Sequence, residues 1–417
     1  MKTREELQHN WYKKGEKYTK AINEMVAFGT EHGWDNWEGE EAEDKRGKIA
    51  KEVIELLREA NANGTVEQFR KDFPPAHAPI VSMLDEKGGY IGDLCYISEG
   101  VIAFMQGTSY ESRQAYIAEG TVLTDLDKEI RNIGQSMQNK VYAIAYADKI
   151  VTRRGWDGEV IAEFHLENLV NTGITRLIPF NDGQKVLFIS SVGIYLLYPN
   201  QVQLLHPEPE EEDDDDDYGT QIDMENATLS YDNEYIVVGD QGSDYLIFDT
   251  SGHKIGVIGP QSSYPHYCLF TKDDKQLLTN SCHFYNGISI GVDTEKLNGA
   301  NIPGWEEHKD IIYLDEGMRV YAGVSLNDYY ILGDAYGYIR AIHKEGRELW
   351  QHFLGSTISG MVLSDDEQTL YVGTHAGILH KLTLNKAVRD THTIGTADIY
   401  EDFRLLIWKN EEKVLVW

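Results

Sequence analysis

Apolar residues in the first part of the chain follow the spacing of amphipathic helices. A recurrence of three to four residues runs from Leu7 to Val26 and returns from Ile49 to Leu57, with the tryptophan-rich stretch HGWDNWEG between the two runs. Thr65 followed by Gln68 fits a capping box and predicts a short third helix over 65–73. Three prolines then end the helical pattern, which predicts an N-terminal helical segment over residues 1–79.

From residue 80 the pattern changes to short apolar runs separated by Gly, Asp and Asn turns, which is typical of β-strands. Three stretches resemble one another: NEYIVVGDQGSDYLIFDTSGHKIGVIG, NDYYILGDAYGYIRAIHKEGRELWQHFLG and EQTLYVGTHAGILHKLTLNKAV. Weaker copies are LCYISEGVIAFMQG, NKVYAIAYADKIVTRRGWDGEVIAEF, GQKVLFISSVGIYLLYPNQVQLL and KQLLTNSCHFYNGISIGVD. Each copy combines a polar turn with two or three apolar strands, so the sequence predicts an internal repeat.

The spacing of the copies indicates the architecture. Equivalent positions near the end of a strong strand are Phe104, Tyr146, Ser190, Gly239, Asn280, Gly333 and Gly373, and the gaps between them are 42, 44, 49, 41, 53 and 40 residues. A repeat of about 40–45 residues with four short strands is typical of a propeller blade. The two long gaps contain the acidic stretch 206–219 and the segment LNGANIPGWEEHKD, both of which we interpret as insertions.

We therefore predict a mainly β fold in which residues 80–417 form a β-propeller with seven blades, with six and eight as the alternatives. The tail DFRLLIWKNEEKVLVW has the pattern of two further strands, 404–408 and 413–417. We expect this hairpin to complete the first blade and close the ring, because closure removes exposed sheet edges.

One repeat points to a family. In GYIRAIHKEGRELWQHFLG, Gly346 and Trp350 occupy the two places of a Gly-x-x-x-Trp hairpin, and this stretch resembles the repeat of PQQ-like, or quinoprotein-like, propellers. Other copies are similar to that repeat and to WD40-like blades but lack its tryptophan. The resemblance covers residues 88–417 and implies the fold; it leaves the function open, because propellers include both enzymes and scaffolds.

The net charge of the chain limits the classes of molecule that it is expected to bind. Its net charge is −31 at pH 7, and such a field repels nucleic acids and anionic membranes while attracting basic proteins. Charge is concentrated in HPEPEEEDDDDDYG, whose carboxylates are Glu208, Glu210, Glu211, Glu212, Asp213, Asp214, Asp215, Asp216 and Asp217. Mutual repulsion predicts an extended insertion, either a solubilising loop or an electrostatic arm for a basic partner.

Catalytic and metal-binding patterns are weak. Cys95, Cys268 and Cys282 form no CxxC pair, which argues against a disulfide scaffold and a cysteine zinc site. His266 and His283 share a repeat with two of these cysteines, but positions packed in a sheet or on its surface explain them more simply than a metal site does. The chain has no His-Glu-x-x-His or P-loop motif, and we assign no catalytic residue, metal ligand or cofactor.

Aromatic residues in predicted turns and insertions complete the functional hypothesis. Tyr and Trp beside carboxylates suit protein interfaces, and we select Tyr264, Tyr285, Trp305 and Tyr336 together with the acidic run as partner-binding residues.

The N-terminus lacks the apolar core of a signal peptide, which favours a cytoplasmic protein. We predict a non-enzymatic scaffold for a basic protein partner, for example an immunity-type inhibitor of a toxin. A propeller enzyme or small-ligand sensor with a site in the central channel is the alternative.

Overall fold

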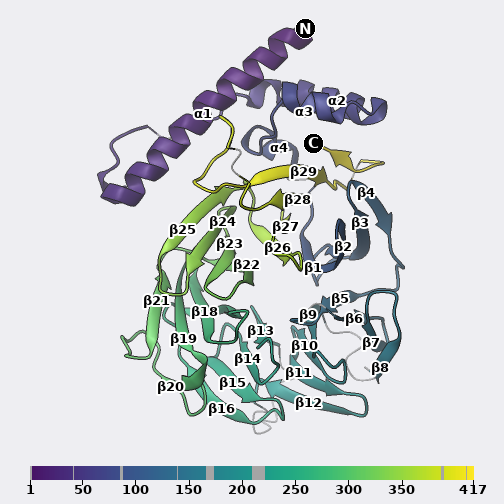
Figure 1. The fold of residues 1–417 in the computed structure, drawn as a ribbon, viewed down its shortest axis with the longest axis vertical. Coiled ribbons are helices and arrows are strands. Elements are labelled where there is room, and N and C mark those ends of the chain that lie inside the picture. Colours follow the sequence, from purple (N-terminus) through teal and green to yellow (C-terminus); the bar gives the residue numbers. More distant parts are fainter. Residues whose placement is uncertain are drawn as a thin grey trace, which may run out of the picture.

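The computed structural model describes residues 2–40, 42–84, 88–138, 140–165, 173–208, 221–386, 389–409 and 411–417. Within these residues, seven mainly antiparallel sheets form a ring around a central axis, and the helices lie at one side of the ring (Figure 1). The structure therefore confirms the mainly β fold, the seven blades and the helical N-terminus.

Each sheet is one blade, whose strands follow one another from the axis toward the rim. Blade one consists of β1 (Ile91–Ser98), β2 (Val101–Gln106), β3 (Gln114–Glu119) and β4 (Val122–Asp125). Blade two consists of β5 (Asn132–Gln135), β6 (Val141–Ala145), β7 (Lys149–Arg154) and β8 (Val160–His165). Blade three consists of β9 (Ile174–Pro179), β10 (Val186–Ser190), β11 (Gly193–Tyr198) and β12 (Gln201–His206).

Blade four consists of β13 (Asn226–Leu229), β14 (Tyr235–Gly239), β15 (Tyr245–Asp249), β16 (Lys254–Ile258) and β20 (Asn301–Ile302), and blade five of β17 (Tyr264–Phe270), β18 (Gln276–His283), β19 (Asn286–Asp293) and β21 (Ile311–Asp315). Blade six consists of β22 (Val320–Ser325), β23 (Tyr329–Asp334), β24 (Tyr338–His343) and β25 (Glu348–Phe353). Blade seven consists of β26 (Ile358–Leu363), β27 (Thr369–Thr374), β28 (Ile378–Thr383), β29 (Tyr400–Leu406) and β30 (Leu415–Val416).

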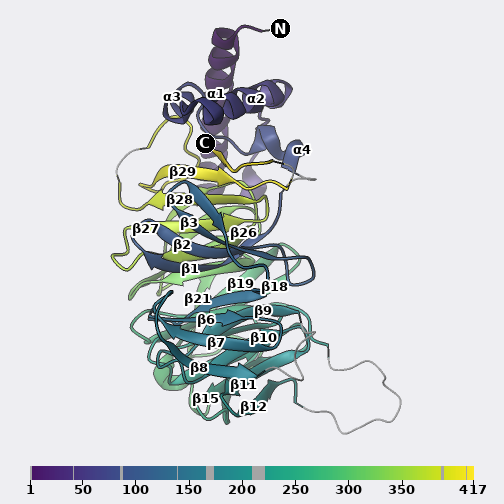
Figure 2. The ribbon, with the colours of Figure 1, turned by 90° about the vertical axis from the view of Figure 1, so that its right-hand side faces the viewer.

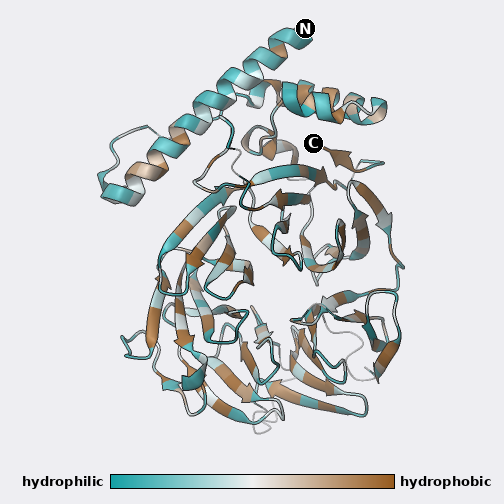
Figure 3. Cartoon of the chain, in the orientation of Figure 1, coloured by the Kyte–Doolittle hydropathy of each residue, from teal (hydrophilic) through white to brown (hydrophobic). Residues whose placement is uncertain are grey.

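The second strand of each blade carries the repeat signal. Six of the seven equivalent positions lie in second strands, and Tyr146 directly follows β6. These strands are strongly apolar because adjacent blades cover both of their faces, and β6 and β10 are buried at every residue. Figure 3 shows hydrophobic residues concentrated in the strands of the ring. The core of the protein is thus a set of apolar layers between blades.

The second predicted insertion links two blades. After β19, a short 3-10 helix, η3 (Thr294–Lys296), leads into β20, which pairs in parallel with β16 of blade four. The chain then returns to blade five as β21, whose partner is β19. An excursion from blade five therefore supplies the outermost strand of blade four, and this exchange ties the two blades together.

The tail closes the fold differently from our prediction. Both of its strands belong to blade seven, where β29 pairs with β28 and β30 pairs with β29, while blade one already has four strands of its own. The prediction that the tail completes blade one is therefore wrong. The ring closes by packing of β1 against β26, and a Cβ added to Gly373 of β27 would meet the carbonyl oxygen of Ile91 at 2.3 Å.

The N-terminal helices lie against the outer edge of blade seven. They are α1 (Arg4–His32), η1 (Trp34–Asn36), α2 (Gly47–Asn63), α3 (Val66–Asp72), η2 (Ala78–Ile80) and α4 (Val81–Leu84). Figures 1 and 2 show them at the rim of the ring, away from both of its faces. The predicted capping box at Thr65 is wrong, since its side chain makes no cap hydrogen bond; the box forms at Thr3 and Glu6 instead.

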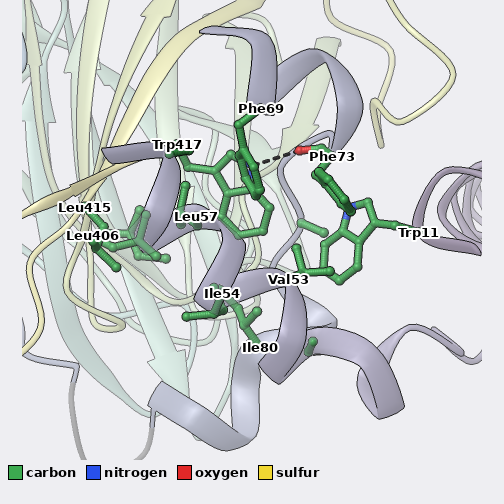
Figure 4. Packing of buried hydrophobic residues seen from close by; sticks show 14 of the residues in the cluster. Trp11, Val53, Ile54, Leu57, Phe69, Phe73, Ile80, Leu406, Leu415 and Trp417 are labelled. Carbon is green, nitrogen blue, oxygen red and sulfur yellow. Dashed lines mark hydrogen bonds between the residues drawn. The ribbon is translucent and has the colours of Figure 1, made fainter. Parts of the chain in front are cut away.

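One hydrophobic core joins the helices to the tail. The ring of Trp417 lies 5.9 Å from that of Trp11 and 6.1 Å from that of Phe69, and its Nε1–H donates to the carbonyl of Phe73 at 2.8 Å (Figure 4). The side-chain amide of Asn61 donates to and accepts from the backbone of Val416, at 2.9 and 2.8 Å, and so covers the free edge of β30. Helices and propeller therefore share one core.

Candidate functional site

One face of the ring gathers the most exposed aromatic side chains. Because blade strands alternate in direction, the turn between the second and third strands lies at the same end of a blade as the start of its first strand. Hydrogen bonds join the two in blades four, six and seven: Gln241 N to Asp223 O at 2.8 Å, Ala335 N to Arg319 O at 3.1 Å and His375 N to Thr357 O at 3.0 Å. We call these turns and the segments leading into the first strands the hairpin face.

Tyr285 and Tyr336 lie side by side on this face, in the hairpins of blades five and six. Their ring centroids are 6.1 Å apart, and they are 65% and 50% exposed. The hydroxyl of Tyr336 donates to Asn286 Oδ1 at 3.2 Å, which links the two hairpins. Phe284, which the sequence analysis did not select, precedes Tyr285 and is 70% exposed. We call Phe284, Tyr285 and Tyr336 the aromatic patch.

The other two predicted aromatics have different surroundings. Tyr264 is the first residue of β17; it is partly buried and lies opposite Cys282 of β18. Trp305 is 67% exposed, and its backbone N–H donates to the carbonyl of Pro260 at 3.1 Å, in the linker that leads to β17. The structure thus brings Tyr285 and Tyr336 together, places Tyr264 partly inside blade five, and places Trp305 beside the linker between blades four and five.

The acidic insertion connects β12 to β13. Glu208 is exposed and forms an ion pair with Lys254 of β16. The remaining carboxylates of the run, Glu210, Glu211, Glu212, Asp213, Asp214, Asp215, Asp216 and Asp217, lie outside the described residues. The insertion returns at Asp223 on the hairpin face, where further exposed carboxylates are Glu111, Asp148, Asp244 and Glu316. The described part of this face therefore carries exposed carboxylates on several blades.

Arg319 borders the aromatic patch and is held by neutral groups. The carbonyl of Phe284 accepts from its Nη1 at 2.6 Å, and Nε2 of His266 accepts from its Nε at 3.2 Å. His266 Nδ1 lies 2.7 Å from the carbonyl of Val320, which fixes the tautomer that leaves Nε2 free to accept. Burial and the charge of Arg319 lower the pKa of His266 to about 3, so the imidazole is neutral at pH 7. The guanidinium also lies over the ring of Tyr321, 4.9 Å from its centroid.

The central channel opens beside these residues. It is a cavity of about 810 Å³, lined by the first strands of all seven blades. Near the start of β1, Asp93 is buried and forms an ion pair with Arg113, while Asn132 Nδ2 donates to Asp93 at 3.4 Å and to the carbonyl of Ile174 at 3.3 Å. Burial raises the pKa of Asp93, and the guanidinium groups of Arg113 and Arg176 oppose that shift.

Sequence reasoning missed the polar residues of the channel. Asp93, Arg113, Asn132 and Arg176 belong to three blades and stand singly within or beside apolar strands, so no motif or spacing marks them. The recurrence of the first strand in every copy is the signal that could have found them, because polar residues near the start of first strands converge on the axis of a propeller.

The cysteines and histidines do not assemble a metal centre in the part of the chain that the structure describes. No group of three or more His, Cys, Asp or Glu residues there is arranged to hold a metal ion. Cys268 is a buried free thiol whose pKa burial raises to about 12, and Cys282 is also buried and free. His283 is exposed at the end of β18, with Nδ1 at 2.9 Å from the hydroxyl of Ser263. Among the described helices, none combines the length and apolarity needed to cross a bilayer.

Comparison with known proteins yields a likeness of fold. No family model and no curated protein matches the chain. Among solved structures, the computationally designed Ika8 protein is similar with a TM-score of 0.46 and 14% identity, over 71% of this chain and 97% of the designed one. The β-propeller domain of Myceliophteria thermophila Cps50 (Swd1) has a TM-score of 0.47 and 10% identity, over 68% and 95% of the two chains. Neither likeness bears on function, and the propeller assignment rests on the seven sheets themselves.

Proposed function

We propose that this protein is a non-enzymatic scaffold that binds a partner protein on its hairpin face. The observation that carries the proposal is the aromatic patch, three adjacent large side chains that are 50–70% exposed. Such side chains supply most of the binding free energy in many interfaces because they offer a large rigid surface at small entropic cost. Tyr336 is already held by its hydrogen bond to Asn286, and its ring lies beside that of Tyr285, so little ordering is needed on binding.

Charge supports a basic partner. The exposed carboxylates of the hairpin face, together with the net charge of −31, create an attractive field for a positively charged surface. Such a field speeds encounter more than it strengthens the final complex. The aromatic patch would then determine the lifetime of the complex, and the acidic residues its rate of formation.

A finer version of the proposal is an immunity-type role, in which the propeller neutralises a basic toxin such as a nuclease by covering its active face. A broad acidic face and a cytoplasmic location would serve that role. We also assign the repeats to the PQQ-like kind on the hairpin of Gly346 and Trp350, where Gly346 has φ +86° and Trp350 packs against the core between blades six and seven.

Affinity capture from the cells of origin, followed by mass spectrometry, would provide the partner, and binding kinetics would then test the proposal. The double variant Tyr285→Ala and Tyr336→Ala should weaken binding by about 30-fold or more, mainly through faster dissociation, since hot-spot truncations cost about 2 kcal/mol or more. Tyr313→Ala is the matched control, because Tyr313 is an exposed tyrosine of the same blade that lies on the outermost strand β21.

Salt dependence tests the electrostatic part. Raising salt from about 0.1 M to 1 M shortens the Debye length from about 10 Å to about 3 Å, so association should slow by roughly tenfold or more while dissociation changes less. An association rate indifferent to salt, or a double variant that binds as tightly as the native chain, would refute the docking mode.

A further inference from the structure

The central channel has the size and lining of a small-molecule pocket. Its volume of about 810 Å³ lies within the range of about 300–1,000 Å³ that is typical of such pockets. Apolar side chains and the tyrosines Tyr90, Tyr267 and Tyr321 form much of its wall. The channel is therefore large enough to hold an organic molecule between the blades.

Arg176 of β9 is one of the residues that line this channel. The charge of its guanidinium lowers the pKa of groups on two other blades, Asp93 of β1 and both Tyr267 and Cys268 of β17. Asp93 makes its ion pair with Arg113, and within the described residues Arg176 takes part in no ion pair. The charge of Arg176 lowers the pKa of Asp93, and its side chain is hydrogen-bonded to Tyr267, but no carboxylate of the described residues pairs with it directly.

Neighbouring groups do not supply a counter-charge. Two carboxylates that line the channel are already paired with lysines, Asp365 with Lys140 at 3.2 Å and Glu367 with Lys272. Glu225, the other buried carboxyl group of the lining, accepts a hydrogen bond from the hydroxyl of Thr175. Burial raises the pKa of Glu225, and the hydrogen bond from Thr175 opposes that shift.

We propose that the channel binds a small organic anion whose carboxylate or phosphate oxygens are held by Arg176. A guanidinium offers paired N–H donors that match the geometry of such oxyanions, and it keeps its charge under all relevant conditions. The hydroxyls of Tyr90 and Tyr267 already donate to the carbonyls of Ser359 and Gly323, at 3.1 and 3.2 Å, so these rings act as walls for the body of the ligand. This binding site is distinct from the aromatic patch.

Calorimetric titration of the full chain with citrate and with inorganic phosphate tests the proposal. At least one of the two should bind saturably at a single site, and the stronger one indicates whether carboxylate or phosphate is preferred. Arg176→Gln should weaken that binding about tenfold or more, because a hydrogen bond to a charged group is lost, while Arg176→Lys should retain part of it. Lys272→Gln, at a paired lysine of the same channel, is the matched control and should bind as the native chain does.

Equal affinities of Arg176→Gln and the native chain, or saturable binding of neither anion, would overturn the proposal. Cooperative thermal unfolding of Arg176→Gln shows that the variant is folded. Should it fail to fold, anomalous diffraction from native crystals soaked in selenate decides the question, with a peak at Arg176 in support and a peak only elsewhere, or none, against. The double variant of Tyr285 and Tyr336 should leave anion binding unchanged, so failure of the partner proposal and failure of this one are distinguishable.

Discussion

Trp417 shows how a single side chain determines the relation between the helices and the propeller. It is the last residue of the chain, it is fully buried, and it contacts Trp11 of α1 and Phe69 of α3 (Figure 4). Arg70 donates to its backbone carbonyl, and Arg404 both donates to and accepts from its backbone. Trp305 offers the opposite environment, since it is 67% exposed.

We predict that Trp417→Ala lowers the free energy of unfolding by about 3–5 kcal/mol, because it leaves a large cavity in a packed core. Trp305→Ala, which removes the same side chain from the surface, should change it by no more than about 0.5 kcal/mol. Urea unfolding of both variants measures the difference. Similar small effects for the two would mean that the helices do not pack on the tail.

At the scale of elements, the seam between blades seven and one depends on glycines. Gly373 of β27 approaches the backbone of Ile91 so closely that an added Cβ would meet its carbonyl oxygen at 2.3 Å, whereas a Cβ at Gly317 would have open space. No strand is shared across this seam, so close packing and a few side-chain hydrogen bonds, such as that from the Ser359 hydroxyl to the carbonyl of Ile91 at 2.7 Å, hold the ring shut there.

Gly373→Ala should therefore destabilise the protein by about 1–3 kcal/mol, the usual cost of overpacking. Gly317→Ala should be neutral or stabilise by up to about 1 kcal/mol, because it only restricts the unfolded chain. Thermal unfolding of the two variants compares them. An unchanged stability of Gly373→Ala would indicate that the two blades can move apart at this contact without loss of free energy.

Histidines with lowered pKa values lie near the contact between the helices and blade seven, one of them, His352, on β25 of the neighbouring blade six. Burial lowers the pKa of His77 to about 3 and that of His352 to about 4. His380 Nδ1 lies 2.6 Å from Glu401, whose carboxylate also pairs with Arg70 of α3 at 2.9 Å. In the unfolded chain histidine has a pKa near 6.5. Between about pH 6.5 and 4 the unfolded state thus binds more protons than the folded state.

The stabilisation that depends on neutral His77 and His352 is fully present above pH 6.5 and is lost as the pH falls toward 4. Each histidine should contribute a slope of about 1.4 kcal/mol per pH unit in this window. His352→Gln should remove one such contribution, and urea unfolding at several pH values between 4 and 7 measures it. An unchanged slope in this variant would show that His352 is protonated in the folded protein.

At the scale of the whole molecule, the helical segment and the propeller form one folding unit. The core around Trp417 contains residues of α1, α2 and α3 together with Leu406, Trp408 and Leu415 of the tail. Removal of residues 1–79 would expose these apolar side chains and the free edge of β30.

We predict that the full chain unfolds in one transition, so that helical circular dichroism and tryptophan fluorescence give coincident urea curves. A chain that begins at residue 80 should be insoluble or self-associated, as judged by size-exclusion chromatography. Two separate transitions, or a monomeric truncated chain with unchanged melting, would contradict a shared core.

The sequence by itself determined the repeated unit and the number of blades. Alternation of apolar and polar positions, turn residues and strand length are local properties, and they recur in every copy, so the equivalent positions from Phe104 to Gly373 were placed on or next to the second strand of each blade. The helical spacing of residues 1–79 was likewise local. Tyr285 and Tyr336 were selected because aromatics in polar turns are visible in sequence.

The tertiary structure alone decided which edges meet and which side chains converge. The tail has the same strand pattern whether it pairs with blade one or blade seven, and its pairing follows from the core that Trp417 completes with the helices. Tyr285 and Tyr336 become neighbours, and Arg176 comes near Asp93 and Tyr267, only when the blades pack around the axis. The members of these pairs are 51 to 91 positions apart in the sequence, so the packing of blades, rather than any local preference, brings them together.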